Sequence, residues 1–346
     1  FGTFCLAIIL IMCIIIVFDF SENVEDFIDK KAPFSTIVFD FYGNLVPFYV
    51  NVFSPLFAFI SVIFFTSRMA SRSEIVAILG SGVSFNRMLA PFLFCESVIT
   101  ILSLYVNHFV LPKANKARLD FEEIFIRNPY HLDDRNIHRQ VSPGTYIYFN
   151  NYNVDQKTGY QFSMEKIKNG SRYYYLRSDQ IRWDTLKNKW TVENYFIRSL
   201  NGMEEVIRKG LRFDTTYEFT PADFGTRPNR IETMNTPELQ KHINEQKMKG
   251  ATRIEFSEVE KHQRTATPFA TIILTIIGVA LASRKVRGGI GLHIGLGLGL
   301  SFTYILFMQV FKTMATNSSF PPVFAVWLPN VIFLFIALYL LKKVPK

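Results

Sequence analysis

The sequence lacks the short motifs by which many enzymes bind nucleotides or metals. It has no Gly-x-x-x-x-Gly-Lys-Ser/Thr loop, no Cys-x-x-Cys pair and no His-x-x-x-His pair. The first absence excludes ATP binding through a P-loop, and the other two leave no metal-ligand spacing. No set of Ser, His and Asp residues stands out either. We therefore expect no catalytic centre, metal or cofactor in this chain.

Cysteine is scarce, with only 3 in 346 residues. All of them (Cys5, Cys13 and Cys95) lie in apolar runs, and the polar block 112–267 has none. Disulfides therefore cannot stabilise that block, although roughly 150 residues are enough for one hydrophobic core. Its charge is only modestly basic, with 26 Lys and Arg against 21 Asp and Glu. Nucleic acid is not an expected partner, because no recognition motif accompanies this charge.

Long apolar runs, in contrast, are abundant at both ends of the chain. A helix needs about 20 apolar residues to cross a bilayer, and six windows approach this length, at about 1–18, 49–66, 89–111, 268–283, 289–311 and 322–341. No small-residue cleavage site follows the first window, so we interpret it as a retained span. The chain opens inside that window, so we expect the natural N-terminus to lie upstream. Three domains are predicted: spans one to three (1–111), an inserted block (112–267) and spans four to six (268–346).

The short connections carry a charge asymmetry that predicts the orientation of these spans. Positive residues gather in two connections and the tail on one side, which the positive-inside rule assigns to the cytosol; they are Arg68, Arg72, Arg87, Arg284, Lys285, Arg287, Lys342, Lys343 and Lys346. The 19–48 connection on the other side is acidic. The block 112–267 falls on that second side, so we expect it to be extracytoplasmic.

The inserted block has the pattern of a β-sheet domain. Alternating aromatic and β-branched residues predict strands at 145–149, 160–164, 173–176, 180–183, 190–193 and 195–198. Turn signals lie between them, at 142–144, 157–159, 169–170, 187–188 and 201–202. Such spacing is typical of a sandwich or jelly roll. After the strands, Thr236 as N-cap and Pro237 at the first position predict a helix that runs up to Gly250.

The segment between the second and third spans, 68–87, is longer than a simple connection requires. Ser71 and Glu74 have the spacing of a capping box, which predicts a short helix over about 71–80. Ile75, Ile78 and Leu79 give this helix an apolar face, and Gly80 ends it. A structured element in this place indicates a docking site. Glu74 is then either a cap or a contact to a partner, with Arg72 beside it.

Two features inside the spans have both structural and functional interpretations. Gly291, Gly295 and Gly299 recur every fourth residue, which favours a helix-packing face over a phosphate-binding loop. Glu96 lies within the third span, where a charge is costly unless it reaches the surface or is paired. Snorkelling or pairing with Arg87 is the structural interpretation of Glu96, and a role in coupling is the functional one.

The order of several motifs resembles one family, the lipopolysaccharide export permeases LptF and LptG. The resemblance covers essentially the whole chain, and it is carried by Ser73-Glu-Ile-Val-Ala-Ile-Leu-Gly-Ser-Gly82, Leu89-Ala-Pro-Phe92, Asn107-His-Phe-Val-Leu-Pro-Lys-Ala-Asn115, Thr236-Pro-Glu-Leu239, Glu258-Val-Glu-Lys-His-Gln-Arg264, Gly288-Gly-Ile-Gly291, Pro321-Pro322 and Trp327-Leu-Pro-Asn330. It implies a membrane α-helical fold of six transmembrane helices (3 + 3) with an inserted extracytoplasmic all-β jellyroll-like domain.

The resemblance also implies partners and a place in the cell. The permease would sit in the inner membrane of a Gram-negative bacterium and pair with a second LptF/LptG-type subunit. Two copies of a cytosolic LptB-type ATPase would hold ATP and Mg and bind Glu74, Arg72, Ile75, Ile78 and Leu79. Lipopolysaccharide would pass from the membrane cavity to the β domain and on to periplasmic LptC/LptA-type jellyroll proteins.

One departure from the family pattern concerns the substrate. Lysines near the outer end of the first span are linked to substrate phosphates in the LptG branch, but that depth is acidic here. Lys30 and Lys31, about two turns further on, are the nearest equivalents. The departure leaves the choice between LptF and LptG open. Two other functions also stay open: a membrane-anchored envelope enzyme and a stand-alone ion-coupled permease.

Overall fold

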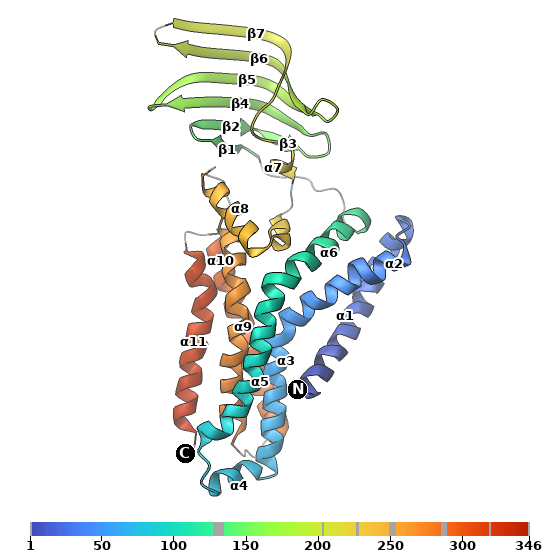
Figure 1. Ribbon diagram of the computed structural model, residues 1–346, viewed down its shortest axis with the longest axis vertical. Coiled ribbons are helices and arrows are strands. Elements are labelled where there is room, and N and C mark those ends of the chain that lie inside the picture. Colours follow the sequence, from blue (N-terminus) through green and yellow to red (C-terminus); the bar gives the residue numbers. More distant parts are fainter. Residues whose placement is uncertain are drawn as a thin grey trace. The chain divides into compact units, whose positions relative to one another are not determined.

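The computed structural model describes residues 2–126, 135–202, 204–225, 228–248, 254–284, 289–317 and 320–344. The chain divides into two compact units (Figure 1). The first, here called the membrane unit, comprises 1–126, 231–239 and 255–346. The second, the β unit, comprises 127–230 and 240–254. Both boundaries of the β unit lie inside the block 112–267, because the flanking helices pack against the spans.

Among the described residues, the membrane unit contains six helices long and apolar enough to cross a bilayer, which confirms the predicted 3 + 3 arrangement. All but the third are longer than their apolar windows, since polar turns continue the helices beyond the hydrophobic part. Their bounds are α1 Gly2–Asp29, α3 Gly43–Ser71, α5 Phe85–Tyr105, α9 Ile254–Ala282, α10 Gly289–Asn317 and α11 Pro322–Lys343. The chain is therefore a multi-pass membrane protein.

Two of these helices are extended through single π-helical segments. The second span begins with α2 (Phe34–Thr36) and the π-helix η1 (Ile37–Tyr42) before α3. The third continues from α5 through the π-helix η2 (Val106–Val110) into α6 (Leu111–Phe125). π-helical turns are rare and occur often at functional sites. The second of them contributes Asn107 and borders the cavity described below.

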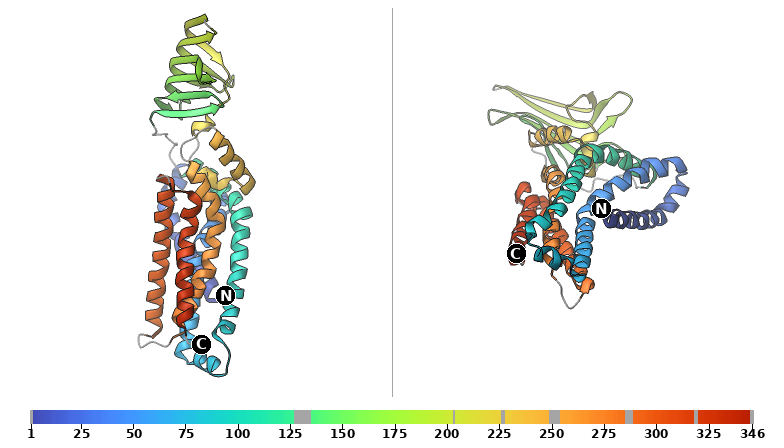
Figure 2. Two further views of the ribbon diagram at one scale, coloured as in Figure 1. Left: turned by 90° about the vertical axis from the view of Figure 1, so that its left-hand side faces the viewer. Right: turned by 60° about the horizontal axis from the view of Figure 1, so that its bottom comes forward.

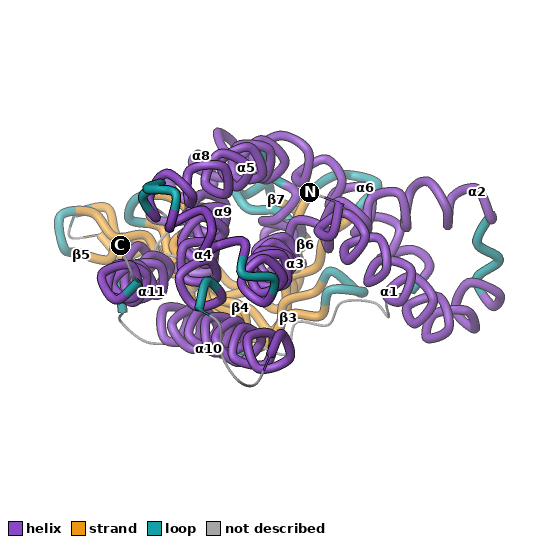
Figure 3. Tube along the Cα trace, turned by 90° about the horizontal axis from the view of Figure 1, so that it is seen from below, coloured by secondary structure: helices purple, strands orange, loops and turns teal. Residues whose placement is uncertain are grey.

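The core of the membrane unit forms where α3 meets α9, α10 and α11. Phe59 and Ile63 of α3 are fully buried there, against Leu274 and Ile277. Figure 2 shows α9, α10 and α11 side by side, and Figure 3, which looks along the bundle, places α1 apart from them. Accordingly α1 leaves many apolar side chains exposed, including Leu6, Ile9 and Phe18.

The glycine stripe of α10 does not contribute to packing within this chain. A Cβ added at Gly291, Gly295 or Gly299 would meet nothing within 4 Å. The glycine that packs is Gly297, where an added Cβ would overlap the side chain of Ile63 on α3. The stripe thus lies on a face of α10 that is open within the chain, and its role against another protein stays a prediction.

The β unit is one antiparallel sheet in the order β1-β2-β4-β5-β6-β7, with β3 paired to β4. This confirms the inserted all-β domain. The strands are β1 Ile137–Ser142, β2 Thr145–Phe149, β3 Asn151–Asn153, β4 Thr158–Lys168, β5 Ser171–Asp184, β6 Lys189–Asn201 and β7 Glu204–Thr215. The strands predicted at 173–176 and 180–183 are parts of β5, and those at 190–193 and 195–198 are parts of β6.

One face of the sheet is covered by the segment that follows β7, residues 217–224, here called the strap. It crosses the sheet from β7 toward β1 and ends at α7 (Ala222–Gly225) (Figure 1). Phe219 and Phe224 are buried against Phe149, Phe162 and Trp190. The indole Nε1 of Trp190 donates to the carbonyl of Phe219 at 2.9 Å. The strap therefore supplies much of the core of the β unit.

The short helix η3 (Pro228–Thr233) and the start of α8 (Thr236–Met248) follow the strap. The N-cap of α8 is Asn235 rather than the predicted Thr236. Asn235 Oδ1 accepts from the Glu238 amide at 2.9 Å, and Glu238 Oε2 accepts from the Asn235 amide at 3.0 Å. This reciprocal pair is a capping box. Thr236 is instead the first helical residue, and its hydroxyl forms a hydrogen bond with His108 Nδ1 at 2.8 Å.

Candidate functional site

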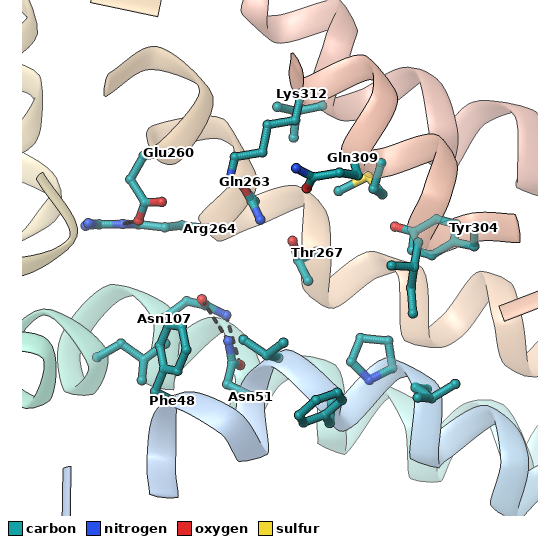
Figure 4. A pocket seen from close by; sticks show the side chains of 18 of the residues that line it. Phe48, Asn51, Asn107, Glu260, Gln263, Arg264, Thr267, Tyr304, Gln309 and Lys312 are labelled. Atoms are coloured by element: carbon teal, nitrogen blue, oxygen red, sulfur yellow. Dashed lines mark hydrogen bonds and ion pairs between the residues drawn. The ribbon is translucent and has the colours of Figure 1, made fainter. Parts of the chain in front are cut away.

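A cavity of about 370 Å³ lies within the membrane unit, between α3, η2, α6, α9, α10 and α11 (Figure 4). Its inner part is mainly apolar and includes Phe53, Leu56, Leu274 and Met308. Its other end, here called the polar mouth, is lined by Glu232, Glu260, Gln263, Arg264, Gln309 and Lys312. A single ligand in this cavity would thus contact both an apolar interior and a charged opening.

The polar mouth is made by the start of α9, the end of α10 and the segment that leads into α8. Gln309 and Lys312 point from α10 toward Gln263 on α9 (Figure 4). Lys312 is also close enough to Glu232 to interact with it electrostatically. The mouth therefore carries a lysine ammonium that faces other polar groups across the opening.

Residues 231–235, here called the junction, are held to the helices by Arg264. This arginine is 4% exposed, and its guanidinium donates to the carbonyls of Met234 at 2.8 Å and Ile231 at 3.3 Å. Its Nε donates to Glu260 Oε1 at 2.9 Å. A buried charge of this kind is stable only when its hydrogen bonds are satisfied. Arg264 consequently fixes the backbone on both sides of Glu232.

Glu232 occupies the centre of a group of charges. Its carboxylate lies 3.9 Å from Arg118, which also forms a 2.8 Å ion pair with Glu122. Burial raises the pKa of Glu232, and the neighbouring carboxylate of Glu260 raises it further, while Arg118 and Lys312 lower it. The nearby cations Arg118 and Lys312 therefore only partly compensate the negative charge of the ionised Glu232 carboxylate.

Several buried polar atoms around the cavity have no hydrogen-bond partner among the described residues. They are Asn115 Oδ1, Gln263 Oε1, Thr267 Oγ1 and Ser301 Oγ. Asn115 is 4% exposed and Ser301 is 1% exposed. Since buried polar groups in proteins are nearly always hydrogen-bonded, such atoms indicate that a polar guest or water completes the site.

Two amides brace the wall of the cavity. Asn51 on α3 donates to Asn107 Oδ1 at 3.0 Å, and Asn107 donates back to Asn51 Oδ1 at 3.1 Å. Ser103 adds a hydrogen bond to Asn51 Oδ1 at 2.7 Å. These hydrogen bonds hold α3 and η2 together.

The predicted coupling helix exists as α4 (Glu74–Gly80), but the predicted capping box was wrong. Ser71 is the last residue of α3, and its hydroxyl donates to the Arg68 carbonyl at 2.8 Å. Ser73 is the residue that precedes α4, with a positive φ of 61° and no side-chain cap. Because α3 continues to Ser71, no free amide is left there for Glu74 to cap.

Glu74 is accordingly free of a capping role at the start of α4. Its carboxylate lies 3.9 Å from Arg72, and the two side chains are 46% and 57% exposed. Ile75 is buried against the bundle, while Ile78 and Leu79 are partly buried. The exposed apolar residue of α4 is Val76, at 64%, which sequence reasoning missed. Ile75 thus anchors α4 to its own chain, and Glu74 and Val76 face outward.

The predicted substrate lysines lie elsewhere. Lys30 and Lys31 are exposed at the end of α1, and neither lines the cavity. Sequence reasoning missed Lys312, because a single lysine near the end of an apolar helix gives no distinctive signal. The described residues also contain no group of three His, Cys, Asp or Glu side chains that could hold a metal ion.

The comparisons with known proteins agree with this architecture. The family model described as "Lipopolysaccharide export system permease LptF/LptG" matches residues 1–343. The protein "Lipopolysaccharide export system permease protein LptG" of Escherichia coli (strain K12) is 18% identical over 306 residues, covering 86% of this chain and 83% of that protein. Its counterpart from Escherichia coli O6:H1 (strain CFT073) has the same identity and coverage. A match over nearly the whole chain, joined to six spans and an inserted β domain, shows that the protein belongs to the LptF/LptG family of lipopolysaccharide export permeases.

Proposed function

We propose that this protein is a membrane subunit of an ATP-driven lipopolysaccharide transporter that accepts the glycolipid in the cavity of its membrane unit. The observation that carries the proposal is the division of the cavity into an apolar interior and a polar mouth, where Lys312 lies beside Glu232, Glu260 and Arg264. A phosphorylated glycolipid has the same division, since its acyl chains avoid water and its phosphates attract cations. The family to which the chain belongs supplies the substrate class.

The remaining parts of the proposal concern partners and place. α4, with Glu74 and Val76 exposed, is the docking element for one copy of an LptB-type ATPase. The second copy docks on the second permease subunit, and both copies bind ATP and Mg. A second LptF/LptG-type subunit completes the permease. The β unit passes the glycolipid to LptC/LptA-type jellyroll proteins. The charge asymmetry of the connections supports an inner-membrane protein with the β unit in the periplasm.

Lipid binding tests the substrate site. Replacing Lys312 by Gln removes the mobile cation of the mouth, so we expect lipopolysaccharide recovered with the purified complex to fall about tenfold, the factor of one lost charge-assisted contact. The measurement is mass spectrometry of co-purified lipid. The matched control, Lys116→Gln, removes an exposed lysine of α6 outside the cavity lining and should leave the yield unchanged. Equal yields from wild type and Lys312→Gln would contradict the proposed site.

Association with the ATPase tests the docking element. Glu74→Gln keeps the shape of the side chain but removes its charge, so we expect co-purification of a nucleotide-binding subunit to weaken by about 1–2 kcal/mol, as for one charged contact at an interface. Because Glu74 makes no cap, the melting temperature of the chain should not change. A complex without any nucleotide-binding subunit in the wild type would instead favour an envelope enzyme or an ion-coupled permease.

A further inference from the structure

We propose that Glu232 is a built-in competitor for the anion site of the cavity: its carboxylate shares the polar mouth with Lys312 and opposes the pairing of a substrate phosphate with that lysine. This inference rests on the proposed function, and it assigns to the same site a means of regulating occupancy. It begins from the observation that an acidic side chain lines the opening through which an anionic head group would enter.

The charges around Glu232 come from every element that packs against it. Arg118 and Glu122 lie on α6, Glu260 and Arg264 on α9, and Lys312 on α10. Arg118 is committed to Glu122 at 2.8 Å, and Arg264 to Glu260 at 2.9 Å. Lys312 is the cation of this group that extends from α10 toward Gln263 on α9 (Figure 4). It lines the cavity together with Glu232, so it is the cation for which Glu232 and an incoming anion would compete.

The backbone geometry allows the carboxylate to yield without unfolding the junction. Arg264 holds the carbonyls of Ile231 and Met234, on either side of Glu232. Asn115 Nδ2 reaches the Glu232 carbonyl at 3.5 Å. The Glu232 side chain is 31% exposed, so its carboxylate can turn toward solvent while its backbone stays bound. The exchange then needs only a rotation of one side chain.

The electrostatic balance favours exchange over permanent pairing. Glu232 lies 3.9 Å from Arg118, longer than the ion pairs formed by Glu122 and Glu260. A phosphate carries more negative charge than a carboxylate and offers more acceptor oxygens. It should therefore outcompete the Glu232 carboxylate for Lys312, whereas an uncharged sugar does not compete for that cation. In this interpretation Glu232 limits how tightly the mouth holds a phosphorylated lipid and so favours its release, while the binding of neutral lipids is unaffected.

The test compares binding of two probes to the full chain in its purified complex: phosphorylated lipid A and dephosphorylated lipid A. For Glu232→Gln we expect the dissociation constant for the phosphorylated probe to fall about tenfold, because a like charge leaves the site. Binding of the dephosphorylated probe should not change. In a Lys312→Gln background the gain from Glu232→Gln should largely vanish, since the two residues act on one contact. Glu255→Gln, on α9 outside the cavity lining, is the matched control.

The pH dependence gives a second readout. Protonation of Glu232 removes its competition, so the ratio of the wild-type to the Glu232→Gln dissociation constant should approach one as the pH falls through the raised pKa of Glu232. Glu122, Glu260 and the lipid phosphates are present in both proteins, so their contributions cancel in this ratio. If Glu232→Gln lowers the melting temperature, Glu232→Asp, with a retracted carboxylate, should give an intermediate gain.

The outcomes separate this inference from the proposed function. Binding that depends on phosphate and Lys312 but is unchanged or weakened in Glu232→Gln would overturn the exchange alone. An equal gain with both probes would also overturn it, since Glu232 would then act by its size. Failure of every variant to bind phosphorylated lipid A would overturn the proposed substrate together with the exchange.

Discussion

At the scale of the residue, the groups that define the cavity come from distant parts of the sequence. Asn115, Glu232, Arg264 and Lys312 lie on α6, the junction, α9 and α10. No local pattern marks any of them, because their proximity is produced by the packing of helices. The sequence singled out Lys30 and Lys31 by analogy with a position along the chain, and they lie outside the cavity. Glu74 was identified from local sequence, since it begins its own short helix.

Glu96 illustrates another limit of residue-level reasoning. Its side chain is 4% exposed, so it does not snorkel to a surface, while Arg87 is exposed near the start of the same helix. Its carboxyl group instead faces the Thr275 hydroxyl on α9. The sequence showed that the position was unusual, but which group would face it depended on how α5 packs against α9.

The glycines of α10 provide a prediction at this scale. Gly297→Val should destabilise the membrane unit by about 1–3 kcal/mol, because its side chain would overlap Ile63 in a packed core. Gly295→Val has the same change in helix propensity but open space around it, so its effect on the isolated chain should be small. Thermal unfolding in detergent compares the two. A larger loss for Gly295→Val would contradict the packing described for α10. If Gly295→Val instead weakened association with a second subunit, the predicted packing role of the stripe would gain support.

At the scale of the element, the central strands with one buried face were found from the sequence and the two edge strands, β1 and β7, were not. β4 and β5 alternate in burial over much of their length, and the turn Asn169-Gly170 has the positive φ angles that its sequence predicts. β7 (Glu204–Thr215) is mostly exposed and rich in charges, so it shows little period-2 contrast. Its pairing with β6 decides its conformation.

The strap is the element whose role the sequence did not reveal, and its anchoring can be tested. Trp190→Phe keeps an aromatic ring but removes the hydrogen bond to the Phe219 carbonyl, so the β unit should lose about 1 kcal/mol. Phe219→Ala removes the buried ring and should cost about 3–5 kcal/mol. Protease cleavage within residues 217–224 should accelerate in the same order. Leu186→Ala, at a side chain 97% exposed in a turn, is the control and should not change the rate. Faster cleavage in Trp190→Phe than in Phe219→Ala would contradict this account.

At the scale of the whole molecule, composition alone predicted the organisation into three spans, an inserted domain and three spans. That prediction succeeded because crossing a bilayer imposes a length and an apolar content that are visible without any contact. The exact extent of the units was less predictable, since α6 and the first turns of α9 are polar yet pack with the membrane unit. Their burial combines apolar contacts, such as Phe121 against Phe41 and the buried Val259, with the polar contacts of Arg118 and Arg264.

The orientation of the chain gives a prediction at this scale. In a variant whose native cysteines are replaced by Ala, a single cysteine at Val76 should react with a membrane-impermeant maleimide only from the cytosolic side. A single cysteine at Leu186 should react only from the opposite side. Both side chains are exposed, so access to the reagent decides the labelling. Labelling of Val76 only from the outer side and of Leu186 only from the cytosolic side would reverse the assignment drawn from the positive-inside rule. Labelling of both from one side would contradict their predicted placement on opposite sides of the membrane.

The hydrogen bonds from Arg264 to the junction have a consequence for which substitutions this protein can accumulate. The guanidinium holds the carbonyls of Ile231 and Met234, which every amino acid possesses. These hydrogen bonds therefore do not depend on which side chains those two positions carry, and substitutions there should leave the hydrogen bonds intact. Arg264 itself has no such freedom, because a lysine could not reach both carbonyls and Glu260 with one planar fork. Among relatives, we would look for drift at positions 231 and 234 beside a fixed arginine at position 264.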